Sequence, residues 1–431
     1  MRTRTRTRHL ELVAGLALGA LALAACGSSQ SSTESSPSGA GAPASADATA
    51  SSAGSASAAP APAGEAVKIG LINQENETVA FPEGSAAAKA VVAYLNAEKG
   101  GIGGRPAELV LCTAGDAPES AVACANQFAN DQTVPLVIDN TYNSAAVNEV
   151  LLDRKALLSF NNDIPDMTTP NAFTLDPGVL VPSAVISDIL KQKGVATVSV
   201  LYTDDPLIKD AVLPLFELAL ANAGITVEQT VPVTSGGDYA AAVAAADPTG
   251  VDGLAMLLVD TAQCAPVGKA LKDLGSTAVV ASADICSAPV AAETGDLDGW
   301  QFAVTNTGTF DPSMPGPGTL ELRRIIETYG EGEPNFATLA GFTAANVLAA
   351  ADIYEKVGVD SLTPEAINAL LSAGWEAEPL TFPPVACPGT APFIGGCGTS
   401  MFWAEIQDGK LGAVQDRAIT VDMAQFADLV Q

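Results

Sequence analysis

The chain has a single histidine among its 431 residues, His9, which lies in an N-terminal stretch that we predict to be removed. The rest of the chain therefore has no imidazole for a Ser-His-Asp or Cys-His nucleophile, or for a zinc site with histidine ligands. It also lacks a Gly-x-Gly-x-x-Gly turn and a Gly-x-x-x-x-Gly-Lys-Ser/Thr phosphate loop. Neighbouring carboxylates remain, notably Asp204 and Asp205, but in a loop such aspartates are far more often turn formers or helix caps. We expect no enzymatic activity, no cofactor and no metal.

Basic residues are also scarce. The chain has 20 lysines and arginines against 49 acidic residues, a formal charge of −29. Without residues 1–25, which carry four arginines and Glu11, 16 basic and 48 acidic residues remain, and the formal charge becomes −32. This charge repels nucleic acid and anionic lipid headgroups, so we expect no nucleic-acid partner. It indicates either the general solubility of a secreted protein or a site tuned to a cationic ligand.

The N-terminal segment has the features of a secretory signal. Arginines at positions 2, 4, 6 and 8 precede a mostly apolar stretch at 10–23, which is too short to remain as a membrane helix. Leu23-Ala24-Ala25-Cys26 resembles the lipobox of bacterial lipoproteins. The resemblance implies that residues 1–25 are a lipoprotein signal peptide and that Cys26 is lipidated, which anchors the protein to the outer face of the cell membrane. The alternative is an ordinary signal peptide followed by a chance cysteine.

Residues 26–65 follow as a separate region. They consist almost entirely of serine, alanine, glycine and proline, with nothing to bury in a core. This composition predicts a disordered tether behind the lipidated Cys26.

Six further cysteines remain, an even number in a chain that we predict to be exported. Fifteen pairings are possible, but neighbours in sequence are best placed to pair. A thiolate metal site is the alternative, and no Cys-x-x-Cys pair supports it. We therefore expect three bridges: Cys112–Cys124, Cys264–Cys286 and Cys387–Cys397.

Short apolar segments and amphipathic segments alternate from residue 66 to residue 304. Residues 67–72 have the composition of a buried strand, because four of the six are apolar and mostly β-branched. A helix with Ser85 as its N-cap is expected next, ending at Gly100-Gly101. Further strands are expected at 109–112, 134–138, 195–202, 225–231, 253–259 and 278–281, and a strand at 401–406 with a hairpin turn at 407–410. This alternation predicts an α/β fold with parallel sheets, helices on both faces, and ligand sites at the carboxyl ends of the strands.

Several stretches carry a family resemblance. They are VKIG at 67–70, YLNAEKGGIGGRP at 94–106, DAPESA at 116–121, the strand at 195–202, and 336–358 with its Ala-rich helix. In order and spacing these resemble the type I periplasmic solute-binding proteins of the branched-chain amino acid class, which serve ABC importers. Related domains also occur in receptor ectodomains and ligand-sensing regulators.

The resemblance implies two doubly wound parallel-sheet lobes joined by three crossovers, near Gly178, Thr305 and Gly398. Lobe one would then hold 66–178 and 305–398, and lobe two 179–304 and 399–431. A ligand held between the lobes shifts an equilibrium between open and closed forms, and a permease would recognise the closed form.

Ligand contacts of the family carry over position by position. The loop after the third strand matches the place where family members hold a ligand carboxylate, and its Thr141, Asn143 and Ser144 can do that work. The next contact loop offers Asn161, Asn162 and Asp163, which are bulkier and more polar than the family's residues. Further contacts in lobe one are expected from Asn73, Gln74, Phe81 and Tyr142. Ordinary turns, caps and packing are the alternative for each position.

Lobe two departs further from the family. Where amino acid binders place an aromatic residue after Tyr202, Asp204 and Asp205, this chain has Leu207. The next loop offers Asp260 and Thr261 instead of an aromatic. Asp284 lies near the family's acidic partner for a ligand ammonium, about one position away. Loss of both aromatics argues against a branched-chain amino acid, and the acidic cleft favours an amine-bearing or hydroxyl-rich solute.

The sequence therefore predicts a lipid-anchored extracytoplasmic protein, expected to be a monomer. It would capture a small polar solute, amino-acid-like or amine-bearing, and deliver it to an ABC permease. The alternative is a receptor module that reports its ligand to a signalling partner.

Overall fold

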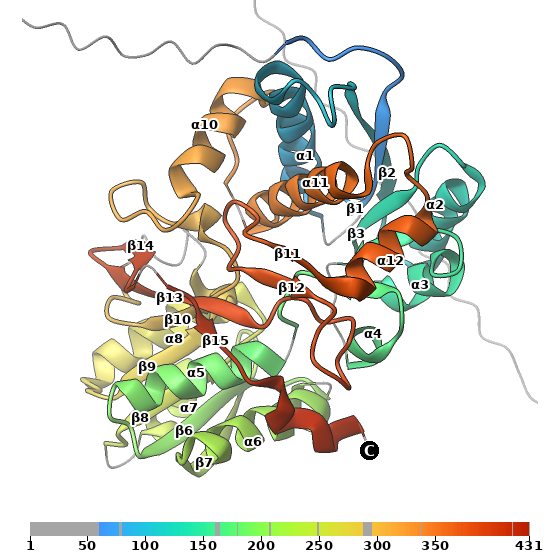
Figure 1. Ribbon diagram of the computed structural model, residues 1–431. Coiled ribbons are helices and arrows are strands. Elements are labelled where there is room, and N and C mark those ends of the chain that lie inside the picture. Colours follow the sequence, from blue (N-terminus) through green and yellow to red (C-terminus); the bar gives the residue numbers. More distant parts are fainter. Residues whose placement is uncertain are drawn as a thin grey trace, which may run out of the picture. The chain divides into compact units, whose positions relative to one another are not determined.

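The computed structural model describes residues 60–76, 80–159, 164–178, 180–206, 208–247, 250–287, 295–336, 338–415 and 417–430 (Figure 1). The predicted signal peptide, Cys26 and nearly all of the predicted tether lie outside these residues. None of the described helices combines the length and the apolar character needed to cross a lipid bilayer.

The N-terminal sheet consists of five described strands, all parallel, in the order β2-β1-β3-β4-β5. The strands are β1 (Val67–Gln74), β2 (Ala107–Ala114), β3 (Leu136–Asn140), β4 (Ala156–Ser159) and β5 (Ala172–Thr174). The helices between them are α1 (Pro82–Tyr94), α2 (Pro118–Asn130), α3 (Ser144–Leu151) and α4 (Ile164–Thr168). Strand and helix alternate as the sequence predicts, although β4 and β5 were not expected.

The second sheet is mixed, and its described strands follow the order β14-β13-β10-β9-β8-β6-β7, with β15 on β13. The parallel strands are β6 (Thr197–Thr203), β7 (Thr226–Val233), β8 (Gly253–Leu257), β9 (Val279–Ala283) and β10 (Gln301–Val304). The antiparallel additions are β13 (Ser400–Gln407), β14 (Lys410–Ala413) and β15 (Ile419–Thr420). Asp408 and Gly409 join β13 to β14 with φ of 51° and 71°, the left-handed pair of a tight hairpin, so the predicted hairpin is confirmed.

The remaining elements complete the two layers. Helices α5 (Leu180–Gln192), α6 (Leu213–Ala223), α7 (Tyr239–Ala246) and α8 (Thr261–Leu274) accompany the second sheet, with short helices η2 (Ile208–Val212), η3 (Asp284–Ser287) and η5 (Met423–Val430). The chain also forms η1 (Leu95–Lys99), η4 (Thr307–Thr309), α10 (Thr319–Tyr329), α11 (Thr338–Val357), α12 (Pro364–Gly374) and the strand pair β11 (Trp375–Ala377) and β12 (Val385–Cys387).

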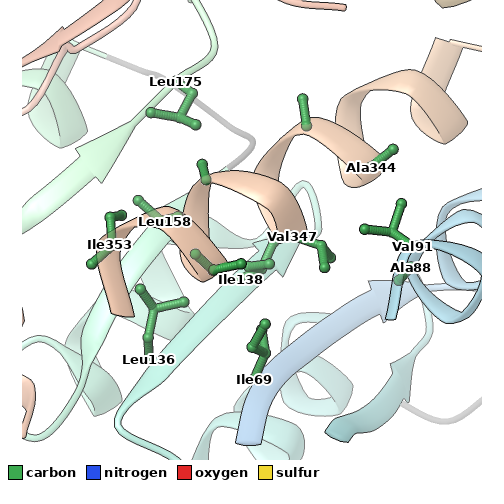
Figure 2. Close-up of a cluster of buried hydrophobic side chains, with 14 of the residues drawn as sticks. Ile69, Ala88, Val91, Leu136, Ile138, Leu158, Leu175, Ala344, Val347 and Ile353 are labelled. Atoms are coloured by element: carbon green, nitrogen blue, oxygen red, sulfur yellow. The ribbon is translucent and has the colours of Figure 1, made fainter. Parts of the chain in front are cut away.

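Alternation along β1 divides the core of the first sheet between two faces. Ile69 and Leu71 face a cluster with helices α1, α11 and α12, whereas Ile72 faces a cluster with α2 and α3. Figure 2 shows the first cluster, in which Ala88 and Val91 of α1 lie with residues of α11 over the strands. Residues far apart in sequence thus share one core, as the period-2 pattern of a doubly covered strand requires.

The second sheet is covered in the same way. Val198 and Val200 of β6 pack with α5 and α6, whereas Leu201 lies in the cluster that contains α7 and α8. The α/β fold with helices on both faces of its sheets, predicted from the sequence, is therefore present.

The predicted start of the first helix was wrong. Helix α1 begins at Pro82, and its N-cap is Phe81. Proline fits the first helical position because its φ is already helical and its missing N–H would have no partner there. Ser85 lies inside the helix, and its hydroxyl donates a hydrogen bond to Glu75. The predicted end is confirmed, since Gly100 caps η1 in the left-handed conformation at φ 76°.

All three predicted disulfides are present. Cys112–Cys124 joins β2 to α2, Cys264–Cys286 joins α8 to η3, and Cys387–Cys397 closes the segment that follows β12. The bridge between α8 and η3 ties together the segments that follow two neighbouring strands, β8 and β9.

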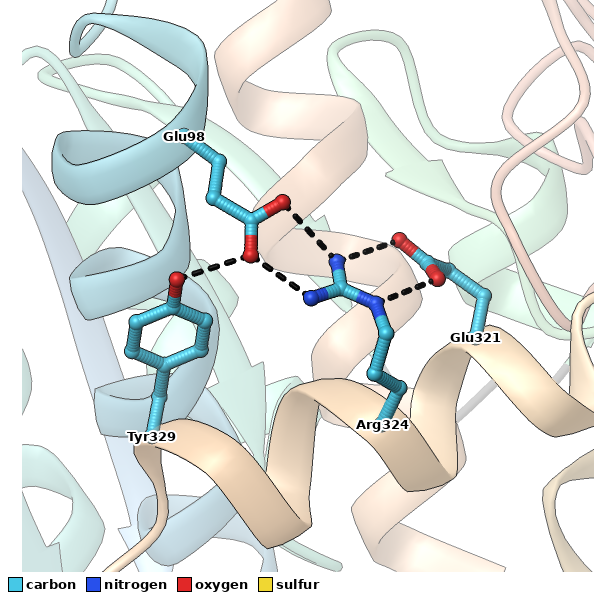
Figure 3. Close-up of polar contacts among 4 residues, drawn as sticks. All are labelled: Glu98, Glu321, Arg324 and Tyr329. Carbon is cyan, nitrogen blue, oxygen red and sulfur yellow. Dashed lines mark hydrogen bonds and ion pairs between the residues drawn. The ribbon is translucent and has the colours of Figure 1, made fainter. Parts of the chain in front are cut away.

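A surface cluster joins the end of the first helical segment to α10 (Figure 3). Arg324 donates hydrogen bonds to Glu98 at 2.6 and 3.0 Å and to Glu321 at 2.8 Å, and Tyr329 donates to Glu98 at 2.7 Å. These contacts link residues more than 200 positions apart and hold the pKa of Glu98 below its usual range.

Candidate functional site

A cavity of about 350 Å³ lies where the loops after several strands come together. Tyr142 follows β3, Asp176 follows β5, Asp284 follows β9 and Thr305 follows β10, so these residues all lie beyond carboxyl ends of strands. This is the edge at which open α/β sheets bind ligands. The described residues around the cavity are Phe81, Glu83, Tyr142, Asp176, Gly178, Pro182, Thr261, Asp284, Ile285, Thr305, Asn306, Leu339, Phe342 and Met401.

Two aspartates give the cavity its charge. One carboxylate oxygen of Asp176 accepts a hydrogen bond from the Gly178 amide at 2.7 Å, and Asp284 accepts one from the Thr305 amide at 3.4 Å. Burial raises the pKa of Asp176 to about 7, and the negative charge of Asp284 adds to the rise. Burial also raises the pKa of Asp284. A cation placed between them would relieve both effects.

A third carboxyl group and a phenol border the same space. Burial raises the pKa of Glu83, and the charge of Glu75 contributes. The pKa of Tyr142 is raised too, by partial desolvation of its hydroxyl and by the negative charges of Asp176 and Asp284. Among the described residues that line the cavity, none is a lysine or an arginine. The electrostatics of the cavity therefore favour positive charge.

Aromatic rings supply the apolar part of the wall. Phe81 and Tyr142 meet edge to face, with ring centroids 5.7 Å apart. The ring of Phe342 packs against that of Phe382, with ring centroids 5.2 Å apart. Phe342 is 2% exposed, whereas Tyr142 is 55% exposed. The rings present both π-faces and hydrocarbon surface to a bound molecule.

Comparison of the sequence with known families decides the identity of this fold. The pattern of the periplasmic binding protein family matches residues 66–381, which is more than half of the chain. The chain belongs to the periplasmic binding protein family. No curated protein sequence matches significantly.

Solved structures of type I periplasmic binding proteins share the fold. An ABC transporter solute-binding protein from R. palustris in complex with 4-hydroxybenzoate is 18% identical with a TM-score of 0.65, over 85% of this chain and all of that one. A branched-chain amino acid ABC transporter protein from Thermus thermophilus with bound valine is 15% identical with a TM-score of 0.64, over 85% and 98%. A fatty acid ABC transporter substrate-binding protein from Thermomonospora curvata is 15% identical with a TM-score of 0.62, over 85% and 96%. At these identities the likeness concerns the fold.

Of the contacts that the sequence predicts for this periplasmic binding protein, four line the cavity: Phe81, Tyr142, Thr261 and Asp284. Asn161, Asn162, Asp163 and Leu207 lie outside the described residues, as does Cys26. The residues at the other predicted positions make their contacts with other parts of the protein.

The loop after β3 forms a closed network of hydrogen bonds. The amides of Thr141, Tyr142 and Asn143 donate to side-chain oxygens of Asp139, Gln74 and Thr141, at 3.1, 3.2 and 3.1 Å. The Ser144 hydroxyl donates to Asp166 at 2.8 Å, and the Asn143 side chain donates to the Asp116 carbonyl at 3.2 Å.

Asn73 and Gln74 at the end of β1 are buried. The Asn73 side chain donates to the Phe81 carbonyl at 2.8 Å, and the Gln74 side chain donates to Asp116 at 3.1 Å. Both side chains thus hold neighbouring segments of this binding protein in place.

Predicted contacts near β6 and β8 have similar roles. Tyr202 lies in the core cluster of β6, α5 and α6. Asp204 accepts a hydrogen bond from Thr234 at 3.2 Å, and Asp205 accepts one from the Ile208 amide at 3.4 Å. Asp260 caps α8 by accepting from the Ala262 amide at 2.9 Å, and Thr261 beside it lines the cavity.

Sequence reasoning did not single out Glu83, Asp176 or Phe342. Asp176 begins the Asp-Pro-Gly turn after β5, a strand of three residues that is too short to show a period. A turn of this composition beside the expected crossover at Gly178 was the available signal. Glu83 and Phe342 lie in helices, and no feature of the sequence distinguishes them from ordinary helix residues.

Proposed function

We propose that this protein is an extracytoplasmic, lipid-anchored solute-binding protein that captures a small polar molecule, amino-acid-like or amine-bearing, and delivers it to an ABC permease. The observation that carries the proposal is the cavity at the strand ends, bordered by Asp176 and Asp284, in a member of the periplasmic binding protein family. A pocket with convergent polar groups and shifted pKa values is what a binding site requires.

Two lobes would close over this ligand. We assign 66–178 and 305–398 to lobe one, and 179–304 and 399–431 to lobe two. Cavity residues at the expected crossings support this division, since Gly178, Thr305 and Met401 lie at or near them. Closure would exclude water and strengthen each polar contact with the ligand.

Export and anchoring rest on the N-terminal sequence. A basic, then apolar, segment ending in Leu23-Ala24-Ala25-Cys26 supports removal of residues 1–25 and lipidation of Cys26. The three disulfides support an oxidising compartment.

The proteins of similar fold do not decide the ligand. Their structures are described with valine, with 4-hydroxybenzoate and as a fatty acid binder. An aromatic acid, a fatty acid and an amino acid differ in charge. The charge of this cavity is therefore a better guide to the ligand class than the ligands of these proteins. It favours a ligand with an ammonium group.

A thermal-shift screen tests the proposal. Purified protein without its leader, stripped of carried-over ligand, is heated with amino acids, amines, sugars, aromatic acids and fatty acids. A ligand at about 100 times its dissociation constant stabilises the folded state by about 2.7 kcal/mol, which raises the melting temperature visibly. Folded protein that responds to no compound would contradict solute capture and favour a sensor that recognises a protein partner.

A further inference from the structure

The cavity and the loop at 141–144 differ in the charge of the ligand group that each could bind. The family resemblance assigns this loop to a ligand carboxylate. The cavity borders three carboxyl groups and no described cationic side chain. The loop at 141–144 has backbone amides and side-chain donors that could bind an anion. Whether they are available depends on the hydrogen bonds that they already make.

Three consecutive amides of that loop are already used. Those of Thr141, Tyr142 and Asn143 each donate to a side-chain oxygen within 3.2 Å. A ligand carboxylate would have to displace these bonds, and each displaced acceptor would then be left without its donor.

Two buried carboxyl groups lie against the loop. Asp139 is fully buried, and one of its oxygens has no hydrogen-bond partner. Asp166 is 5% exposed and accepts from Ser144. Two buried carboxyl groups beneath the loop oppose an anion there, because like charges in a poorly hydrated site repel strongly.

The aromatic rings suit the other part of a ligand. Phe81 and Tyr142 meet edge to face at the cavity, and Phe342 lines it as well. A cation near such rings gains from the negative charge of their faces, and hydrocarbon gains from burial.

We infer that the ligand is an organic ammonium ion with an apolar substituent and without a carboxylate, bound with its positive charge between Asp176 and Asp284. This inference rests on the proposed function and narrows its ligand class. It separates this protein from binders that hold both ends of an amino acid.

Matched ligands test the inference by isothermal titration at pH 7.5. Phenethylamine, phenylalanine and 3-phenylpropionate share one apolar body and differ in charge, and benzyltrimethylammonium has a cation without N–H groups. We expect phenethylamine to bind at least about tenfold more tightly than phenylalanine, and 3-phenylpropionate not to bind. If benzyltrimethylammonium binds as tightly as phenethylamine, the cation is recognised by its charge and by aromatic contact. If phenethylamine binds and benzyltrimethylammonium does not, the ammonium is recognised through its N–H hydrogen bonds. Both results support the inference.

Substitutions locate the cation. Asp284→Asn and Asp176→Asn keep the size of each side chain and should each weaken amine binding by about tenfold. Asp252→Asn is the control, since Asp252 does not line the cavity and accepts hydrogen bonds from the Ala196 and Thr197 amides, and the affinity of this variant should not change. Melting temperatures check that each variant is folded. Weaker amine binding in only one of the two cavity variants still supports the inference, provided that the control variant binds the amine as tightly as the unsubstituted protein.

The outcomes separate this inference from the proposed function. Phenylalanine or another amino acid that binds more tightly than its amine would overturn the inference and leave solute capture intact. Binding of sugars or acids with no response to any amine would do the same. If no compound binds to folded protein, both fail.

Discussion

Two polar regions lie at the strand ends of this protein, and they use their polar groups differently. In the loop after β3, amides and side chains from Thr141 to Ser144 bond to oxygens of the protein itself. At the turns after β5 and β9, Asp176 and Asp284 accept backbone hydrogen bonds and also border a cavity of about 350 Å³. The first region stabilises the fold, and the second places two carboxyl groups at the cavity.

The difference shows why polar composition alone is a weak guide to a binding site. Asn143 and Ser144 are as polar as any residue of the cavity, but their bonds are made within the protein. A buried polar group that already has its partner gains little from a ligand, because binding would only exchange one hydrogen bond for another.

The largest effect is expected from the disulfide beside the cavity. Replacing both Cys264 and Cys286 by serine should lower the free energy of unfolding by about 2–4 kcal/mol in urea titrations. It should also weaken binding of the ligand found in the screen several-fold, because the bridge joins α8, which begins with Thr261, to η3, which begins with Asp284.

The Cys112–Cys124 pair gives the control. It joins β2 to α2, and neither cysteine lines the cavity. Its removal should lower stability and leave affinity unchanged. Equal losses of affinity in both variants would mean that the bridge at α8 has no particular role in shaping the site.

The pH dependence of stability probes the region behind the loop. Burial raises the pKa of Asp139 to about 7, from an ordinary value near 3.8. The folded state then holds a proton that the unfolded state has lost, so stability falls as the pH rises from about 4 to above 7. For ligand-free protein we expect a loss on the order of 2 kcal/mol between pH 5 and pH 8, measured by urea titration.

Asp139→Asn should reduce this slope by roughly half, because Asp176 has a similarly raised pKa and keeps its own contribution. The amide cannot ionise, and its oxygen can still accept from the Thr141 amide, which is 3.1 Å away. Salt-bridged acids with lowered pKa values, such as Glu98, act in the opposite sense but only in more acidic solution. A slope that is unchanged in the variant would assign the whole effect to Asp176.

Ser144→Ala should have a smaller effect, confined to stability. The change removes the donor to Asp166 in a buried network and should cost about 1–2 kcal/mol of unfolding free energy. Ser313→Ala, at an exposed hydroxyl that donates to Asp311 at 2.5 Å, should change stability much less. Affinity for an amine should be unaffected by either; a large loss in Ser144→Ala would return the loop to the binding site.

The smallest effect is expected at the surface cluster of Figure 3. Arg324→Ala removes the bonds to Glu98 and Glu321, whose side chains are 37% and 40% exposed. Solvent and salt screen such pairs, so the melting temperature should fall only slightly, and less in 1 M salt than in dilute buffer. A fall that salt does not reduce would show that packing of the Arg324 chain on Tyr94 is the larger contribution.

The sequence predicts much of this fold because its central strands are buried on both faces. Continuous apolar runs identify β1 and β6 without ambiguity, and each disulfide joins cysteines that are neighbours in sequence. Strands of three or four residues, such as β5 and β10, have no recognisable period. The start of α1 was misplaced because a serine was preferred over Pro82.

The candidate site is less predictable for a related reason. Asp284 follows a recognisable strand, whereas Asp176 follows β5, so one half of the acidic pair was anticipated and the other was not. Whether Ser144 faces a ligand or bonds to Asp166 depends on the position of α4, which residue order alone does not give.

The packing of α1 against α11 has a consequence for how the chain acquires its structure. Ala88 and Val91 of α1 share a core with Ala344 and Val347 of α11, about 250 residues later in the sequence (Figure 2). Since a chain is synthesised from its N-terminus, the apolar face of α1 is made long before its cover exists. The segment at 180–304, whose strands and helices are contiguous, can form its contacts during that interval. Covering of this face of the first sheet by α11 is therefore expected to be a slow, late step of folding, and α1 and β1 are most exposed to aggregation before it occurs.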